Sequence, residues 1–440
     1  MSAFRSGAFR WLWSSTLAAS TGAGLQQTAT AWLALAAGPF AVGLVLAARM
    51  LPSLLFGLAA GTLADRAHRH RLLVGVSLSA IPIMLTLNRV AASDSVAVWQ
   101  VIALAFATGC LTVFDVPARQ ALVMDTVPRD VAPNAMGLNA LGGRLCTALG
   151  ALAAGALIPI AGVATCYLVV ALAYALAAGL AGFARASASQ PSHGARHRPS
   201  FVSALGEAAR LVLDVAAVRT LILAGIACEI FGFSFQTAVP VFARDVLTAG
   251  AEGLGTLNAA TSLGGSLAVV ILSMVPSRVR REPLLGGVFV AYGGSLVALG
   301  MTRDLPLAAA CLLVIGACAA SFDLLQQTLI QLAVPEEQRG RAVGVWVLGI
   351  GSGPVGHVEM GGLVAGLGAP TALWINGCLV LAGAAALLVR APGYRSRVVS
   401  WPDAARLRSR LSHPGAIRGQ RRPPVPGPRR PTGADRQWRR

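Results

Sequence analysis

Apolar residues follow one another along this chain in long continuous runs, and short polar segments separate the runs. A helix of about 20 residues crosses the roughly 30 Å of a bilayer's hydrocarbon core. Because the runs do not alternate between apolar and polar positions, they favour helices over the strands of a membrane barrel. The runs predict twelve spans, near residues 12–37, 42–64, 72–91, 97–118, 137–159, 163–183, 219–243, 254–275, 284–301, 305–326, 342–366 and 370–390.

The composition agrees with this pattern. Of the 440 residues, 55% are hydrophobic and only 12% are charged, whereas about 25% of the residues of a soluble protein are charged. The first apolar run is longer than the roughly 7–15 residues of a signal peptide's apolar core, so it is expected to remain as a span. The sequence therefore predicts a polytopic helical membrane protein.

Two polar regions divide the chain. The longest internal one, residues 184–218, is expected to be a cytoplasmic linker with a surface helix, between six-helix bundles at residues 1–183 and 219–390. Residues 391–440 hold 13 arginines against two aspartates and are rich in proline and glycine, which predicts a disordered basic cytoplasmic tail. In a membrane protein, attraction of such a tail to anionic lipid headgroups is favoured over nucleic-acid binding.

The arginines predict the orientation of the spans. They gather in every second loop, while the intervening loops hold only Arg89, Arg244 and Arg303. Basic residues concentrate in the cytoplasmic loops of membrane proteins, so both termini are expected in the cytoplasm. The arginine-rich segments contain Arg66, Arg69, Arg71, Arg119, Arg129, Arg185, Arg196, Arg198, Arg278, Arg280, Arg281, Arg339 and Arg341.

The two halves of the chain resemble each other. The segment FDVPARQALVMDTVPRDVAPNAMGL begins at Phe114, and FDLLQQTLIQLAVPEEQRGRAVGV begins at Phe322. The Phe-Asp, Val-Pro and AMGL/AVGV pairs recur in the same order, and a single gap aligns them. Repeated bundles are typical of secondary transporters, which bind the substrate near the midplane between the repeats.

Residues 61–71 read GTLADRAHRHR and lie between the second and third expected spans. This segment resembles the signature loop of the major facilitator superfamily, G-x-L-A-D-R-x-x-R-x-R. LQQTATAWLAL, FDVPARQALV, AVPVFARDVL and QLAVPEEQRGRAVGV are similar to segments of the branch that contains the enterobactin exporter and multidrug and macrolide efflux proteins. The resemblance covers about residues 8–390. It implies an all-α membrane fold of twelve transmembrane helices in two six-helix pseudo-repeats.

The resemblance also implies that the signature loop belongs to a cytoplasmic gate. Asp65 would face the N-terminal end of the eleventh span, where the helix dipole favours an anion. A role as topological anchors stays open for the arginines, and His68 and His70 are by default solvated loop residues. The expected gating residues are Gly61, Asp65, Arg66, Arg69, Arg71, Asp115, Arg119, Asp323, Arg339 and Arg341.

Charged residues inside spans are costly and mark candidate functional positions. Glu229, near the middle of the seventh span, is the first candidate for coupling transport to protons, and Glu359 is the second. A structural acid with a permanent partner is the alternative for both. Asp115 and Asp323 occupy equivalent repeat positions, and Arg119, one turn after Asp115, is its expected partner.

The substrate cavity is expected to be lined by polar and aromatic residues within the spans. Of the adjacent Gln26 and Gln27, one is expected to bind substrate while the other packs between helices. Arg49 and Arg144 are the cations of the second and fifth spans, and Phe233 is a further aromatic of the seventh. The residues expected to line the cavity are Gln26, Gln27, Arg49, Phe231 and Phe235.

Together these features predict a secondary active transporter that exports small amphipathic molecules such as a drug, a macrolide or a siderophore. Proton antiport by alternating access is the expected mechanism, in a monomer of the bacterial inner membrane. No G-x-x-x-x-G-K-[ST] phosphate loop, cofactor motif or metal-ligand spacing is present, so an enzyme is not expected. An uptake permease for a small metabolite and a non-transporting membrane sensor remain as alternatives.

Overall fold

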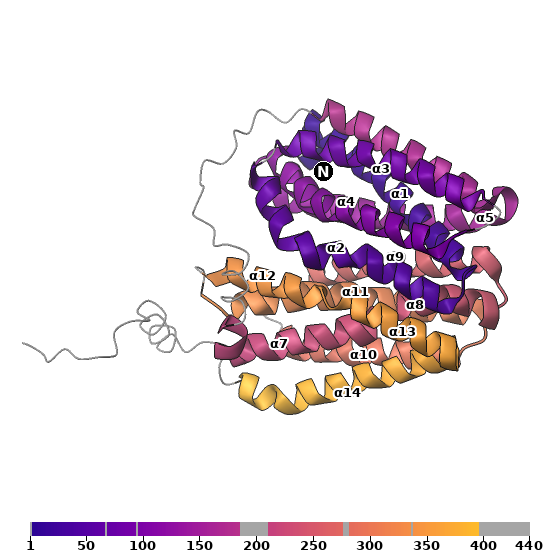
Figure 1. The fold of residues 1–440 in the computed structure, drawn as a ribbon. Coiled ribbons are helices and arrows are strands. Elements are labelled where there is room, and N and C mark those ends of the chain that lie inside the picture. Colours follow the sequence, from indigo (N-terminus) through magenta and orange to yellow (C-terminus); the bar gives the residue numbers. More distant parts are fainter. Residues whose placement is uncertain are drawn as a thin grey trace, which may run out of the picture. The chain divides into compact units, whose positions relative to one another are not determined.

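The computed structural model describes residues 2–66, 68–93, 96–184, 210–275, 281–335 and 338–395, and all regular structure among them is helical (Figure 1). Most of the expected linker and tail therefore lies outside the described residues. Where these segments are described, they differ from the expectation at two points. Residues 216–218 already belong to the next helix, and residues 391–395 continue the last helix instead of starting the tail.

The first half begins with a 3₁₀ turn and continues in long helices. These are η1 (Ser2–Arg5), α1 (Gly7–Leu35), α2 (Pro39–Arg66), α3 (Arg69–Ala91), α4 (Val98–Asp125) and α5 (Ala132–Phe183). The continuous stretch α5 contains two helices, because Gly162 lies at φ 79° and ψ 165° between them. Only glycine adopts this backbone conformation readily. The break separates the expected fifth and sixth spans.

The second half is more interrupted. Its elements are α7 (Ala216–Ala227), η2 (Cys228–Gly232), α8 (Phe235–Val241), η3 (Phe242–Val246), α9 (Gly250–Met274), α10 (Arg281–Met301), α11 (Leu305–Leu332), α12 (Arg339–Ile350), α13 (Gly353–Leu367) and α14 (Ala369–Arg395). Both η2 and η3 are π-helical turns, so the expected seventh span is one helical stretch with two wide turns in it. Residues 210–214 are also helical.

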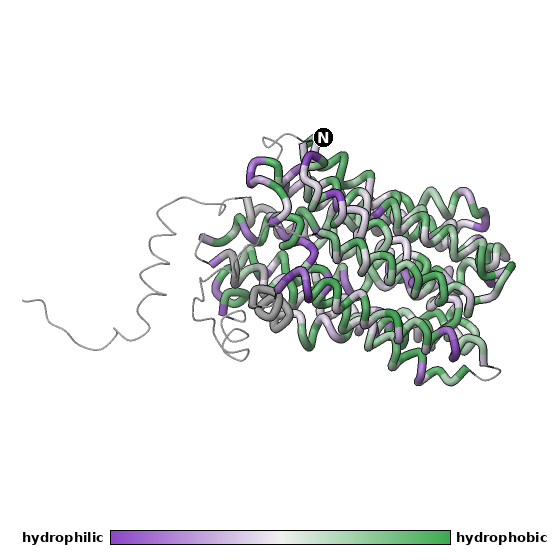
Figure 2. The backbone as a smooth tube through the Cα atoms, turned by 90° about the horizontal axis from the view of Figure 1, so that it is seen from above, coloured by the Kyte–Doolittle hydropathy of each residue, from purple (hydrophilic) through white to green (hydrophobic). Residues whose placement is uncertain are grey.

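Nine helical stretches in the described part of the chain are long and apolar enough to cross a bilayer. Neither α1 nor the α12–α13 pair, which match the expected first and eleventh spans, is among them. The many serine, threonine and glutamine residues of α1 lower its hydropathy, and α12 and α13 are each short. Figure 2 shows hydrophobic residues over most of the length of the helices. Large apolar side chains are exposed on their outer faces, including Ile160, Met274 and Leu172, as expected for surfaces that face lipid.

Glycines at equivalent positions of the two halves permit equivalent helix crossings. A Cβ atom at Gly109 in α4 would collide with the backbone carbonyl of Arg49 in α2. A Cβ atom at Gly316 in α11, 207 positions later, would collide in the same way with the carbonyl of Thr261 in α9. Small residues allow such close backbone approach in membrane helices. The crossing of α4 with α2 and the crossing of α11 with α9 are thus close-packed in the same way.

The helices of the two halves meet along two seams. In one seam α5 packs against α9, and in the other α2 packs against α13. The seams are close because both sides carry small residues: Gly155 faces Gly255, and Gly43 faces the backbone of His357 and Gly361. Between the seams lies the polar site described next.

Candidate functional site

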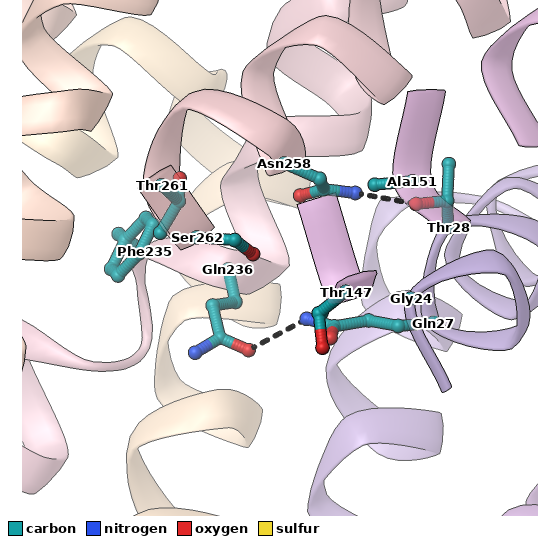
Figure 3. A pocket seen from close by; sticks show the side chains of 10 residues that line it. All are labelled: Gly24, Gln27, Thr28, Thr147, Ala151, Phe235, Gln236, Asn258, Thr261 and Ser262. Carbon is teal, nitrogen blue, oxygen red and sulfur yellow. Dashed lines mark hydrogen bonds between the residues drawn. The ribbon is translucent and has the colours of Figure 1, made fainter. Parts of the chain in front are cut away.

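A small polar cavity lies between the two halves, with α1 and α5 on one side and α8 and α9 on the other (Figure 3). Two hydrogen bonds cross it: Gln27 Nε2 donates to Gln236 Oε1 at 3.4 Å, and Asn258 Nδ2 donates to Thr28 Oγ1 at 3.1 Å. Its lining residues are Gly24, Gln27, Thr28, Thr147, Ala151, Phe235, Gln236, Asn258, Thr261 and Ser262.

The size of this cavity decides how it can function. Its volume of about 40 Å³ has room for a few water molecules, since one water needs about 10–15 Å³. Sites for small organic molecules usually measure about 300–1,000 Å³. A small organic molecule of that size therefore does not fit the cavity as it stands in this structure.

The adjacent glutamines of α1 have different surroundings: one lies at the cavity and the other is packed between helices. Gln27 lines the cavity, whereas Gln26 is buried within the first half. Gln26 Nε2 donates to Thr108 Oγ1 at 3.4 Å, and the Tyr174 hydroxyl donates to Gln26 Oε1 at 3.3 Å. Gln26 thus packs between helices, and Gln27 lies at the cavity; that Gln27 binds substrate stays a prediction.

Of the aromatic residues expected at the cavity, one lies there. Phe235 is a lining residue. Phe231 is not among the residues that line this cavity and is partly buried against the hydrophobic core, so its expected role stays a prediction. Phe233 packs against Tyr292 and Phe322, with ring centroids 6.1 Å and 6.5 Å apart. Residues two positions apart on a helix point in nearly opposite directions, so the three aromatics of this span are not expected to meet on one face.

Glu229 lies in the π-helical turn η2 and is only 6% exposed. Within the described residues its carboxylate has no hydrogen bond or ion pair, and one of its oxygens points toward Gly353 at the start of α13. Glu359, in α13, is half-buried and accepts a 3.2 Å hydrogen bond from Asn376 Nδ2. Glu229 is thus the less satisfied of the two acids.

His357 connects the seventh span to the second. The ring is 2% exposed, its Nδ1 is hydrogen-bonded to Thr237 Oγ1 at 2.9 Å, and its Nε2 lies 3.1 Å from Met50 Sδ. Arg49, next to Met50, interacts electrostatically with His357 and with Tyr174. Arg49 is not one of the residues that line the cavity.

The two equivalent aspartates have different surroundings. Asp115 receives two hydrogen bonds from Arg119, at 2.9 Å and 3.1 Å, so the pair expected from their spacing is present. Arg119 also donates to Thr16 Oγ1 at 3.2 Å. Asp323 is half-buried in α11 and interacts electrostatically with Arg144 of the other half.

The expected gate is described only in part. Gly61, Asp65 and Arg66 belong to the last turns of α2, and Arg339 and Arg341 to the first turn of α12, but their side chains lie outside the described structure. Arg69 Nη1 donates to Asp125 Oδ2 at 2.7 Å, which joins α3 to the end of α4. Arg71 is exposed.

His70 differs from the expectation of a solvated loop residue. It lies in the first turn of α3, is partly buried, and its Nε2 is 2.8 Å from the carbonyl oxygen of Ala181 near the end of α5. α3 begins at Arg69, three residues before the expected third span, so residues 69–71 belong to the helix and not to the loop. His68 is exposed at the N-cap position.

Most residues that line the cavity were not singled out from the sequence. The polar ones among them are Thr28, Thr147, Gln236, Asn258, Thr261 and Ser262, and the others are Gly24 and Ala151. The only feature of the sequence that could have identified the polar lining residues is that they are uncharged polar residues within expected spans. Such residues also hydrogen-bond to their own helix, as Thr147 and Thr261 do here, so their presence does not reveal which face of the helix they occupy.

Comparison with known proteins shows to which family this chain belongs. The family model for transmembrane secretion effectors, within the major facilitator superfamily, matches residues 1–414. The chain belongs to this family. It is therefore an integral membrane protein of a family of transporters, which are not enzymes, and its context is a membrane and a small-molecule substrate.

Two curated relatives are similar in sequence. The staphyloferrin A transporter of Staphylococcus aureus is 23% identical over 329 residues, which span 72% of this chain and 79% of the relative. The enterobactin exporter EntS of Salmonella typhimurium is 31% identical over 144 residues, which span 32% of this chain and 34% of the relative.

Solved structures share the fold at low sequence identity. A peptide transporter POT in complex with sulfate aligns with a TM-score of 0.68 at 12% identity, over 88% of this chain and 94% of that one. The nucleoside transporter NupG aligns with a TM-score of 0.67 at 12% identity, over 87% of this chain and 98% of that one. These alignments support the major facilitator architecture.

Proposed function

We propose that this protein exports a small siderophore-like or amphipathic molecule across the bacterial inner membrane, in exchange for protons, by alternating access. The observation that carries the proposal is the closed polar cavity between the two halves, and a second support is Glu229, a buried acid without a hydrogen bond or ion pair among the described residues. The names of the two curated relatives supply the substrate class, and one of them is called an exporter.

The proposed architecture has twelve spans in two bundles of six, residues 1–183 and 219–390, joined by a cytoplasmic linker at residues 184–218. The equivalent crossings of Gly109 and Gly316 support the repeat. The backbones of Gly162 and Gly368, each between two helices, support it further, with φ 79° and 81°. The basic tail, both termini in the cytoplasm and a monomeric state belong to the same proposal.

Substrate entry in this proposal requires the halves to separate at the cavity. The hydrogen bonds from Gln27 to Gln236 and from Asn258 to Thr28 then break, and their polar groups become free to bind the substrate. The signature loop, with Asp65 and Arg66 at the end of α2, gates the cytoplasmic side. Arg69, paired with Asp125, holds α3 against α4 at that side.

Proton coupling is assigned to Glu229 first and to Glu359 second. A coupling acid has to bind and release a proton during the cycle, which a permanent partner would hinder. Glu359 has a hydrogen-bond donor in Asn376, whereas Glu229 has no partner in the described structure. Glu229 therefore fits the coupling role better.

The direction of transport is tested in cells. Bacteria that lack their own siderophore exporters are loaded with radiolabelled enterobactin or another labelled siderophore, with and without the expressed protein. Export predicts several-fold lower retention with the protein, and this difference is lost when a protonophore is added. Higher retention would instead support an uptake permease, and saturable binding without flux would support a sensor.

A further inference from the structure

The internal repeat shows a difference in charge between the two halves. Asp115 of the first half is followed four residues later by Arg119, which neutralises it. Asp323 occupies the equivalent position of the second half, but the residue four positions later is Gln327. Asp323 thus lacks the neighbour on its own helix that would balance its charge.

The cation that acts on Asp323 comes from the other half of the molecule. Arg144 in α5 interacts electrostatically with Asp323 in α11, and its guanidinium lies against Gly265 in α9, where a Cβ atom would collide with it. No arginine stands at the equivalent position of the second half, where the aligned segment reads Gly351. Arg144 is therefore a one-sided feature that reaches between the halves.

Arg144 lies about one helical turn from residues that line the polar cavity, both on its own helix α5 and on the neighbouring helix α9. Thr147, three residues later on α5, lines the cavity and shares a helix face with Arg144. On α9 the lining residues Thr261 and Ser262 are one turn from Gly265, against which the guanidinium lies. A molecule that occupied an opened cavity would meet this guanidinium.

The charge of Arg144 has no direct partner. Within the described residues, Arg69, Arg119 and Arg244 each donate to an aspartate at 2.6–3.1 Å. Arg144 makes no hydrogen bond or ion pair there, although it is half-buried within a membrane-spanning helix. An unpaired charge in such a position is costly, and an anion that binds to it recovers the cost.

We propose that Arg144 binds an anionic group of the transported molecule, a carboxylate or another oxyanion, and exchanges its interaction with Asp323 for that group. This inference rests on the proposed function and adds the chemical class of the substrate. A planar guanidinium presents paired donors that match a carboxylate, which gives a short, charge-assisted contact. Asp323 is the internal competitor, because it attracts the same guanidinium while the cavity is empty.

If Asp323 and the bound anion compete for Arg144, substitutions of the two residues have opposite effects on anion binding, which a purely structural ion pair would not produce. Loss of Arg144 weakens anion binding, whereas loss of the charge of Asp323 strengthens it, since the guanidinium is then free. If the two residues only hold the halves together, removal of either charge destabilises the protein and neither change alters anion binding.

The test uses the purified full-length protein in lipid nanodiscs. Citrate, which carries three carboxylates, is titrated at constant ionic strength, and its neutral triethyl ester serves as the reference compound. Thermal unfolding followed by tryptophan fluorescence gives the stabilisation at each concentration, and from it the apparent Kd. The variants are R144Q, R144K, D323N and the exposed control R303Q.

We expect citrate, but not the ester, to stabilise the wild-type protein and R303Q equally. R144Q should weaken citrate binding at least about tenfold, R144K less so, and D323N should strengthen it several-fold. D323N keeps the test valid if R144Q does not fold. Equal citrate binding by wild type, R144Q and D323N, or no stabilisation of the wild type by citrate, would overturn the proposal.

This outcome is separable from that of the proposed function. Citrate binding is measured without flux, so it can fail while labelled siderophore is still exported. Conversely, binding that depends on Arg144, with no transport in cells, would overturn the proposed export and leave the anion site in place.

Discussion

Arg119 and Glu229 are both charged residues that are nearly buried within spans, but their surroundings differ. Arg119 is 8% exposed and has two hydrogen bonds to Asp115 and one to Thr16. Glu229 is 6% exposed and has no hydrogen bond or ion pair in the described structure, and the charge that acts on it is that of Asp323, which is also negative. The first arrangement stabilises the bundle, while the second leaves a group whose protonation can change during transport.

The Asp115–Arg119 pair is predicted to be structural. Asp115→Asn leaves the buried guanidinium without its counter-charge and should cost about 3–5 kcal/mol of stability. The double change D115N/R119Q removes both charges and should recover most of that loss. Thermal unfolding of wild type, D115N, R119Q and the double variant in the same detergent measures the coupling energy of the pair. If the stability losses of the two single variants simply add up in the double variant, the two residues do not form a buried pair.

Some of this residue-level detail follows from the sequence, and some does not. The spacing of Asp115 and Arg119 on one helix face identified the pair directly, because it depends only on local geometry. The roles of Gln26 and Gln27 depend on how α1 is rotated, and adjacent positions on a helix point about 100° apart. Only the three-dimensional packing assigns Gln27 to the cavity.

At the scale of elements, glycine backbones divide the helices of each half at corresponding points. Gly162 lies at φ 79° and ψ 165°, and Gly368 lies at φ 81° and ψ 159°. Residues with a Cβ atom are strained in this region, so a helix cannot continue through it. The apolar pattern predicted a break near each position, since both fall between adjacent spans.

Alanine substitutions test these breaks. Gly162→Ala and Gly368→Ala should each destabilise the protein by about 1–3 kcal/mol, because alanine is strained at this backbone conformation. Gly179→Ala is the matched control, in a regular helix where a Cβ atom would meet nothing within 4 Å. It should be neutral or slightly stabilising. Thermal unfolding separates the two results, and equal effects at all three sites would contradict the assignment.

The two π-helical turns of the seventh span could not be expected from the pattern of apolar residues. A π turn adds one residue to a helical turn, and the apolar content is the same with or without it. It shifts the rotation of every residue that follows, so the apolar pattern does not fix which side chains of this span face the cavity. The turn η2 carries Glu229 itself, and wide turns of this kind are frequent at functional sites.

At the scale of the whole molecule, the two halves are in contact along two seams, and the cavity between the halves is small. The structure is therefore a closed arrangement of the two halves. The small residues Gly43, Gly155, Gly255 and Gly361 allow backbones of opposite halves to touch. The cavity of about 40 Å³ has to enlarge before it takes a substrate. Fold class and family were accessible from the sequence, because they depend on span number and local motifs. The cavity was not, because it depends on helix rotation.

The proposed exchange of anions at Arg144 also restricts which acid can couple proton movement to export. An anion that draws Arg144 away leaves Asp323 without its cation, so Asp323 then binds a proton together with the anion. Antiport requires the opposite relation between proton and substrate. A different acid therefore has to couple proton entry to export, and Glu229 is the candidate.

Proton movement in everted membrane vesicles tests this account most directly. Vesicles with an acidic lumen and a pH-sensitive dye receive a panel of siderophores and drugs, and wild type is compared with Glu229→Gln and with the exposed control Glu252→Gln. The account predicts substrate-evoked proton release by wild type and E252Q, and its loss in E229Q. Undiminished release by E229Q, or entry of labelled siderophore into wild-type vesicles without any proton release, would contradict it.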